Sequence, residues 1–327
     1  VCADPISDNV NTSNGWSALT SFNGLTGEPQ KFPLAGMDLA FGPDGSYYVY
    51  GQKGWHELVT RFDRSFNPLP FSGTGKNTTS MTTTQRDVYG RYGHGWCNKG
   101  VAVAPDGRIY VYNMFDWNKY FINTWDATGK AEKHGRVGDG LIGPLDAQGG
   151  GIAVDAKGNI YVGMTGLPAG APAAAKGVGS IVKFGPGGGG YGPAGGNPGI
   201  DWKGSPVGKV VEGGLKAYPG LGLQVWEGCV CKEARFDLDR YGRLFVPNAA
   251  TYSVGILDNA GNEIVRFGYY GNGDARGRSE PALAFGFPMA VSAGQLDVGR
   301  LYVADLLNQR IARLDVRYGL EEICAVE

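Results

Sequence analysis

The sequence predicts an all-β fold made of repeated antiparallel sheets, and three observations carry that prediction. An apolar strand, a tight turn with glycine and a strand rich in aromatic and β-branched residues recur in this order five times. Glycine makes up 56 of 327 residues, well above its usual share of roughly 7%, which indicates many tight turns. No long amphipathic helical pattern is present. Four antiparallel strands followed by a restart are typical of a β-propeller blade.

The five copies each begin with a hairpin. They lie at residues 37–50, 101–112, 152–163, 235–247 and 289–305. Each turn glycine stands between two runs of β-forming residues, as a hairpin requires; these glycines are Gly45, Gly107, Gly158, Gly242 and Gly299. A third strand is predicted at 58–63, 121–129, 180–188, 254–262 and 310–316. A fourth is clearest at 263–268, with another candidate at 320–326.

These repeats predict one propeller domain over residues 1–327, and six blades are favoured over the five clear repeats. Blades of this kind usually repeat at about 40–50 residues, so the wider spacings here require loop insertions, which composition places near 68–96 and 165–230. A sixth blade could be assembled from 191–230 or partly from 17–25. Residues 1–34 are expected to help close the ring by pairing with the last blade.

Two of the copies resemble NHL repeats. Residues 151–163 read as the first hairpin of such a repeat, and 301–315 carry Asp305, Asn308, Arg310 and Ile311 at the positions of the family's second strand and Asn-x-Arg motif. The resemblance covers residues 35–327 in patches and implies a propeller. Members of that family include scaffolds, protein- and RNA-binding modules and a few enzymes such as the amidating lyases. Those lyases use several histidines around a zinc, and three scattered histidines here count against that subfamily.

Charge and hydropathy exclude some classes of partner. The formal net charge is −1 at pH 7 and the basic residues are scattered, so no field favours nucleic acid. No segment has the roughly 20 apolar residues that a membrane span needs. The sequence begins at Val1 without an initiator methionine and has five cysteines. Both features lead us to expect a processed protein that is secreted or periplasmic.

Aligning the copies on their turn glycines places a set of charged residues together at one mouth of the channel. The first strand of each blade lines the channel, and charges stand out against strands that are otherwise apolar; the set is Asp38, Lys99, Lys232, Glu233 and Arg235. It forms either a solvated ring of compensating charges or a ligand site for a polar or anionic group.

Loops after the second strands hold a second set of candidates. Asn113, Asn248 and Asn308 could contact a ligand, and Asn and Asp oxygens in these loops could bind Ca²⁺. The alternative is local turn chemistry, which these residue types also favour.

The cysteines allow a disulfide or a metal site. The alignment brings Cys97, Cys229 and Cys231 to one face, with His94 three residues before Cys97. These ligand types suit zinc or copper, but one disulfide between Cys97 and Cys229 or Cys231 is preferred in an oxidising compartment. Cys2 and Cys324 lie near the two ends of the chain, and a disulfide between them would hold the ring closed.

The sequence thus predicts an extracytoplasmic propeller that acts as a binding or scaffold module for a protein, glycan or small ligand at the channel mouth. The alternative is a metal-assisted lyase or hydrolase with its site at the central channel. Motifs for covalent haem, P-loops, serine nucleophile elbows and zinc metalloproteases are missing. Whether the protein is an enzyme stays open.

Overall fold

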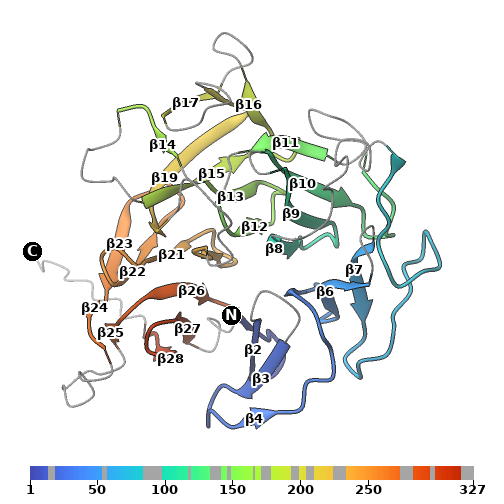
Figure 1. Cartoon of the computed structure of the whole chain (residues 1–327), viewed down its shortest axis with the longest axis horizontal. Coiled ribbons are helices and arrows are strands. Elements are labelled where there is room, and N and C mark those ends of the chain that lie inside the picture. The colour runs from blue at the N-terminus through green and yellow to red at the C-terminus, as the bar shows by residue number, and fades with distance from the viewer. Residues whose placement is uncertain are drawn as a thin grey trace, which may run out of the picture.

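Six blades stand around a central channel in the computed structural model of the chain (Figure 1). Every regular element in the described part of the chain is a β-strand, so the predicted all-β propeller with six blades is confirmed. No helix in that part is long and apolar enough to cross a membrane. The structure describes residues 1–13, 19–53, 57–83, 98–116, 119–132, 141–145, 149–164, 166–170, 178–192, 199–203, 210–223, 233–272, 283–294 and 299–317.

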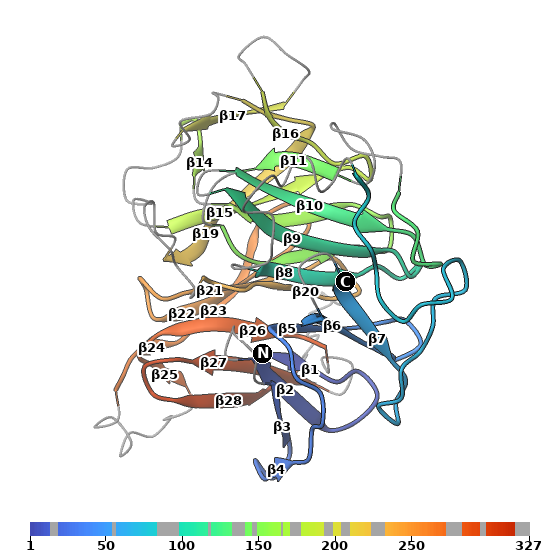
Figure 2. The same ribbon diagram turned by 45° about the vertical axis from the view of Figure 1, so that its right-hand side comes forward.

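The N-terminal residues form a complete four-stranded blade, which is the first along the chain. It brings the number of blades from the five clear repeats to six. Its strands run outward in chain order: β1 (Cys2–Ala3), β2 (Asn9–Ser13), β3 (Leu19–Asn23) and β4 (Pro29–Gln30). This blade meets the last blade where the Ala3 N–H donates to Ser292 Oγ at 2.9 Å. Figure 2 shows β1 and β2 between the strands of the last blade and those of the second. The ring is therefore closed by neighbouring blades, not by N-terminal strands added to the last sheet.

The second and third blades follow the predicted hairpins. The second contains β5 (Asp38–Phe41), β6 (Tyr47–Lys53) and β7 (Glu57–Phe62), and isolated bridges join β7 to Pro68 and Thr78. The third contains β8 (Asn98–Val103), β9 (Ile109–Asp116), β10 (Lys119–Trp125) and β11 (Leu141–Leu145). Thus the start of the predicted insertion at 68–96 borders the outer strand of the second blade.

The fourth blade carries the second insertion. Its strands are β12 (Ile152–Val154), β13 (Ile160–Met164), β15 (Val178–Phe184) and β19 (Gly214–Leu223). A separate sheet is made of β14 (Leu167–Pro168), β17 (Gly199–Lys203), β18 (Val210–Glu212) and β16 (Gly190–Gly192). The segment 191–230, considered above for a sixth blade, instead supplies part of this extra sheet and the outer strand of the fourth blade.

The fifth and the last blade complete the ring. The fifth blade contains β20 (Asp237–Leu238), β21 (Leu244–Asn248), β22 (Ser253–Leu257) and β23 (Glu263–Phe267). A short parallel pair, β24 (Tyr269–Tyr270) and β25 (Ala284–Phe285), leads to the last blade. The described strands of that blade are β26 (Pro288–Ser292), β27 (Arg300–Asp305) and β28 (Arg310–Asp315).

The hairpin turns explain why Asp and Gly recur at fixed positions. In the fourth blade the Asp155 carboxylate accepts the N–H groups of Lys157 and Asn159, each at 2.9 Å. Gly158 closes the turn with a φ of 79°, a backbone conformation that glycine adopts without steric cost. The turn between β20 and β21 repeats this arrangement with Asp239 and Gly242.

The hydrophobic core lies between adjacent blades. All five residues of β13 and of β21 are buried, because each second strand packs against neighbours on both faces. One buried cluster fills each of the interfaces between consecutive blades. The cluster between the first and last blades is the smallest of those described, with three buried residues, Ala3, Val10 and Tyr302.

Candidate functional site

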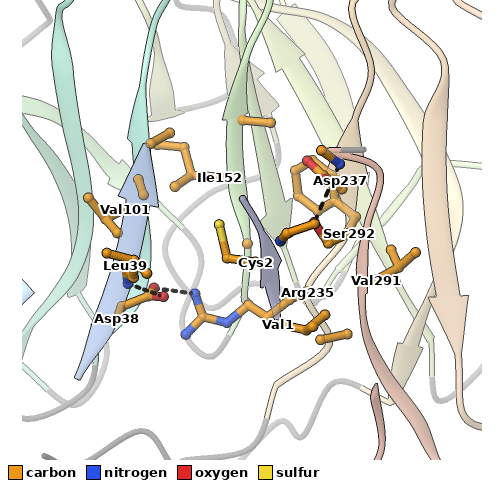
Figure 3. A pocket seen from close by; sticks show the side chains of 18 of the residues that line it. Val1, Cys2, Asp38, Leu39, Val101, Ile152, Arg235, Asp237, Val291 and Ser292 are labelled. Atoms are coloured by element: carbon orange, nitrogen blue, oxygen red, sulfur yellow. Dashed lines mark hydrogen bonds and ion pairs between the residues drawn. The ribbon is translucent and has the colours of Figure 1, made fainter. Parts of the chain in front are cut away.

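A cavity of about 600 Å³ occupies the central channel (Figure 3). The innermost strands of all six blades line it, namely β1, β5, β8, β12, β20 and β26. Apolar residues of these strands, such as Leu39, Val101 and Ile152, contribute much of its wall. The charged groups are concentrated in one layer.

The most buried part of this layer is an ion pair between Lys99 and Glu233. Lys99 belongs to β8 of the third blade, and Glu233 lies before β20 of the fifth blade. Their side chains are only 1% and 3% exposed. The Lys99 ammonium also lies over the ring of Tyr120, 5.4 Å from its centroid. Because a lone buried charge is costly, each group requires the other.

Arg235 is the cation that faces the cavity. Its guanidinium lies 3.4 Å from Asp38 Oδ2 and 3.9 Å from Glu233 Oε2, and it points across the channel toward Asp38 (Figure 3). The side chains of Arg235 and Asp38 are 26% and 27% exposed. The Arg235 backbone is fixed to β26, donating to Met289 O at 2.8 Å and accepting from the Val291 N–H at 3.1 Å. The charged head is thus held by the fold while it remains open to the cavity.

Two glycines make room for these side chains. A Cβ on Gly150 would lie 2.5 Å from Glu233 Cβ, and one on Gly100 would lie 3.1 Å from Arg235 Nη1. Gly150 precedes β12 and Gly100 lies within β8, at or beside the repeat position that Arg235 fills in the fifth blade. Side chains from the fifth blade therefore lie over bare backbone in the third and fourth blades.

A second polar group lies on the wall near β20 and β26. Asp237 accepts the N–H of Ala293 at 2.7 Å and that of Leu238 at 2.8 Å, and it bonds the Ser292 hydroxyl. Burial raises the pKa of Asp237 above its usual range, and the same cause raises the pKa of the Cys2 thiol. The cavity wall thus holds a carboxyl with a raised pKa as well as the partly exposed Arg235 guanidinium.

The raised pKa of Asp237 gives a testable pH dependence. Between the unfolded pKa and the raised folded pKa, the folded state binds more protons than the unfolded chain, so this group lowers the free energy of unfolding as the pH rises. Asp237→Asn should remove that contribution. Chemical denaturation of both proteins at a series of pH values above 4 measures it.

The matched control is Asp258→Asn, since hydrogen bonds from Asn262 lower the pKa of Asp258. Asp258 therefore contributes stability that is lost as the pH falls, the opposite sign. Wild type and Asp237→Asn with the same pH slope would contradict the assignment.

The three predicted loop asparagines are engaged away from the cavity wall. Asn113 is buried and accepts a hydrogen bond from the Tyr50 hydroxyl at 3.2 Å. Asn248 donates to Gly220 O at 3.0 Å, and Asn308 donates to Gly271 O at 2.8 Å and to Asp305. None of the three is among the residues that line the channel cavity. Asn248 also accepts the Ala250 N–H at 3.0 Å, which is the local turn chemistry given above as the alternative. The contacts of Asn113 to Tyr50 and of Asn308 to Gly271 instead join distant parts of the chain.

The remaining predicted ligands lie largely outside the described residues. This holds for Lys232, for the metal candidates His94, Cys97, Cys229 and Cys231, and for Cys324. Cys2 carries a free thiol in the cavity, and its predicted disulfide with Cys324 stays a prediction. The described residues contain no group of three or more His, Cys, Asp or Glu placed to hold a metal ion.

Asp237 was not among the channel residues that the repeat alignment predicted. The available signal was its place in β20, where it alternates with Phe236 and Leu238 on a strand that enters the channel. An ionisable side chain at an inward position of a first strand is the same signal that identified Asp38 and Arg235.

Comparison with known proteins supports the fold and nothing finer. No protein-family model matches the chain, and no curated protein matches it. Among solved structures it is similar to regucalcin, a calcium-binding protein from Agrobacterium tumefaciens, with a TM-score of 0.52 and 13% identity over 97% of this chain and 90% of that one. It is also similar to a protein of unknown function from Bacteroides caccae, with a TM-score of 0.50 and 12% identity over 94% and 89% of the two chains.

A third similar structure is an auxiliary nutrient binding protein from Bacteroides thetaiotaomicron, with a TM-score of 0.50 and 12% identity over 96% of this chain and 67% of that one. At such low identity these likenesses show a shared propeller fold alone. The fold that the NHL resemblance implied is confirmed, while membership of that family stays a prediction.

Proposed function

We propose that this propeller binds a small molecule in its channel and that the ligand presents a carboxylate to Arg235. The observation that carries the proposal is a partly exposed guanidinium on the wall of a cavity of about 600 Å³. Sites for small ligands are typically concave, mostly apolar and about 300–1,000 Å³ in volume, with a few polar groups that fix orientation. The channel has these properties.

The pairing of charges around Arg235 favours an exchangeable anion at that position. Lys99 compensates Glu233 in the buried pair, so Asp38 is the nearer counter-ion of Arg235. Its contact of 3.4 Å is longer than the roughly 2.7–2.9 Å of a strong charge-assisted hydrogen bond. A ligand carboxylate can form two parallel bonds with the planar guanidinium. In this arrangement the ligand carboxylate displaces Asp38 from the guanidinium, and the other Asp38 oxygen keeps its hydrogen bond from the Leu39 N–H at 2.9 Å.

Substituting Arg235 and Asp38 should change carboxylate binding in opposite directions. Arg235→Gln should weaken binding of hexanoate by about 10- to 100-fold, since hydrogen bonds to charged groups contribute about 1.5–3 kcal/mol. Asp38→Asn removes the competing carboxylate and should strengthen binding severalfold. Ligand-observed NMR with hexanoate, and with 1-hexanol as the uncharged control, measures both effects. Equal binding of hexanoate to wild type and Arg235→Gln would refute the anchor.

This proposal selects the small ligand among the partner classes that the sequence left open. Supporting it over a glycan or protein partner is the volume of the concave channel cavity, which lies within the range of small-ligand sites. An extracytoplasmic location remains part of the proposal. The zinc or copper site rests on residues outside the described part of the chain, and the calcium site on Asn and Asp side chains of the loops. The metal-assisted enzyme stays a prediction from the sequence.

A further inference from the structure

A second cavity, of about 790 Å³, lies in the seam between the first and last blades. We use "seam" for the space between β2–β3 on one side and β27–β28 on the other. Its walls are mainly apolar and include Val10, Phe22 and Leu25 from the first blade and Tyr302, Ala304 and Ile311 from the last.

The seam and the channel share part of their lining. Ser13, Met289, Ala290 and Leu306 line both cavities. Met289 and Ala290 belong to β26, the strand to which the Arg235 backbone is bonded. The Arg235 backbone is therefore bonded to the strand that lines both cavities, while its guanidinium points across the channel toward Asp38.

The seam is also the least filled of the interfaces between blades in the described structure. Its buried cluster has three residues, whereas the cluster between the third and fourth blades has fourteen. Polar contacts brace its outer rim: Arg313 Nη1 donates to Leu25 O at 3.1 Å, and Arg300 pairs with Asp8. The interface is thus held at its edge, and the cavity inside it is lined by apolar side chains together with Asp305, Arg310 and Arg313. Well-packed interiors leave few voids larger than a water molecule, so this space is available for apolar atoms.

We propose that the ligand is an amphiphilic carboxylate, whose head group binds Arg235 and whose unbranched or aromatic apolar tail runs past Met289 into the seam. The inference rests on the proposed function and adds the chemical class of the ligand. A short carboxylate would occupy the channel alone, while a longer one would also bury its tail between Phe22 and Ile311. The charge of Arg235 determines which end lies in the channel.

Chain length is the direct test. Isothermal titration of the wild-type protein with butyrate, hexanoate, octanoate and decanoate should show affinity rising about three- to fourfold per added methylene, the factor expected for burial of a CH₂ group. The rise should stop once the seam is full. The alcohols of the same lengths should bind at least tenfold more weakly than the acids.

A variant that fills the seam separates the tail from the head. Ala304→Leu places a larger side chain in the seam without touching the channel wall, and should weaken decanoate binding at least tenfold while leaving butyrate unchanged. Ala250→Leu, an exposed position in the turn after β21, is the matched control and should change neither. Thermal unfolding checks that both variants are folded. If Ala304→Leu does not fold, the chain-length series on the wild-type protein decides the question.

The outcomes distinguish the two proposals. The seam inference is overturned if affinity does not depend on chain length, or if a folded Ala304→Leu binds decanoate as the wild type does. The proposed function still stands in that case, provided that butyrate binds through Arg235. Binding of no carboxylate at all overturns both. Alcohols that bind as tightly as the acids overturn the role of Arg235 as the anchor.

Discussion

Lys99→Met is expected to lower the free energy of unfolding by about 3–5 kcal/mol, the cost of breaking a buried ion pair by removing one partner. The substitution leaves the Glu233 carboxylate 3% exposed without its ammonium. The next cation, Arg235, lies 3.9 Å away and also contacts Asp38, so it compensates only in part. Chemical denaturation monitored by far-UV circular dichroism measures the loss.

The double variant Lys99→Met/Glu233→Gln is the control for this expectation. With no charge left to bury, it should recover at least half of the stability lost in Lys99→Met, because two neutral groups replace the pair. A loss below about 1 kcal/mol in the single variant, or a double variant no more stable than the single, would contradict the account of this pair.

Asp305→Ala is expected to lower the free energy of unfolding by at least about 3 kcal/mol. The buried Asp305 carboxylate accepts the backbone N–H groups of Gly286 and Phe287 at 3.1 Å and 2.8 Å, and it also bonds Asn308 and Arg310. Each buried donor left without an acceptor costs about 1–3 kcal/mol. The substitution should release the segment that joins β25 to β26 from the last blade.

Asp315→Ala is the matched control on the same blade. The Asp315 side chain is 63% exposed and lies 3.6 Å from Arg313, a surface pair that contributes little. Its replacement should change stability by no more than about 0.5 kcal/mol. If Asp305→Ala were equally mild, the hydrogen-bonded network around Asp305 would not be holding the last blade.

The five repeated hairpins could be predicted because each turn carries a local signal. In the second to fifth blades the turn glycine donates its N–H to the carbonyl three residues before it, as Gly158 does to Asp155, and so the pattern is visible along the chain. The first blade lacks that signal. Its innermost strand is only Cys2–Ala3, and residues 4–8, which join it to β2, contain no glycine. The sequence therefore left the sixth blade open between two segments.

The NHL-like residues of the last copy have a structural explanation. Asp305, Asn308 and Arg310 bond one another and the backbone around β25, which explains the motif without a ligand. An asparagine that braces a turn and one that binds a ligand look alike in a sequence, because both need the same polar side chain in the same loop. Asn308 and Asn248 could therefore not be separated from ligand-binding residues in advance.

The position of the charged layer could be predicted from the sequence, but the pairing of its cations with its anions could not. The repeat alignment put Asp38, Lys99, Glu233 and Arg235 at one level of the channel, and the structure brings these four together. Which cation pairs with which anion depends on how the third and fifth blades face each other across the ring. The seam was likewise invisible to sequence reasoning, since it depends on how the first and last blades pack.

A crystal structure of the protein soaked with octanoate tests the central claim most directly. The account predicts density for the carboxylate within hydrogen-bonding distance of the Arg235 guanidinium, Asp38 turned away from it, and the alkyl chain passing Met289 toward Ala304. Octanoate bound elsewhere, or bound with its carboxylate at Arg313 on the outer rim and its tail in the channel, would contradict it.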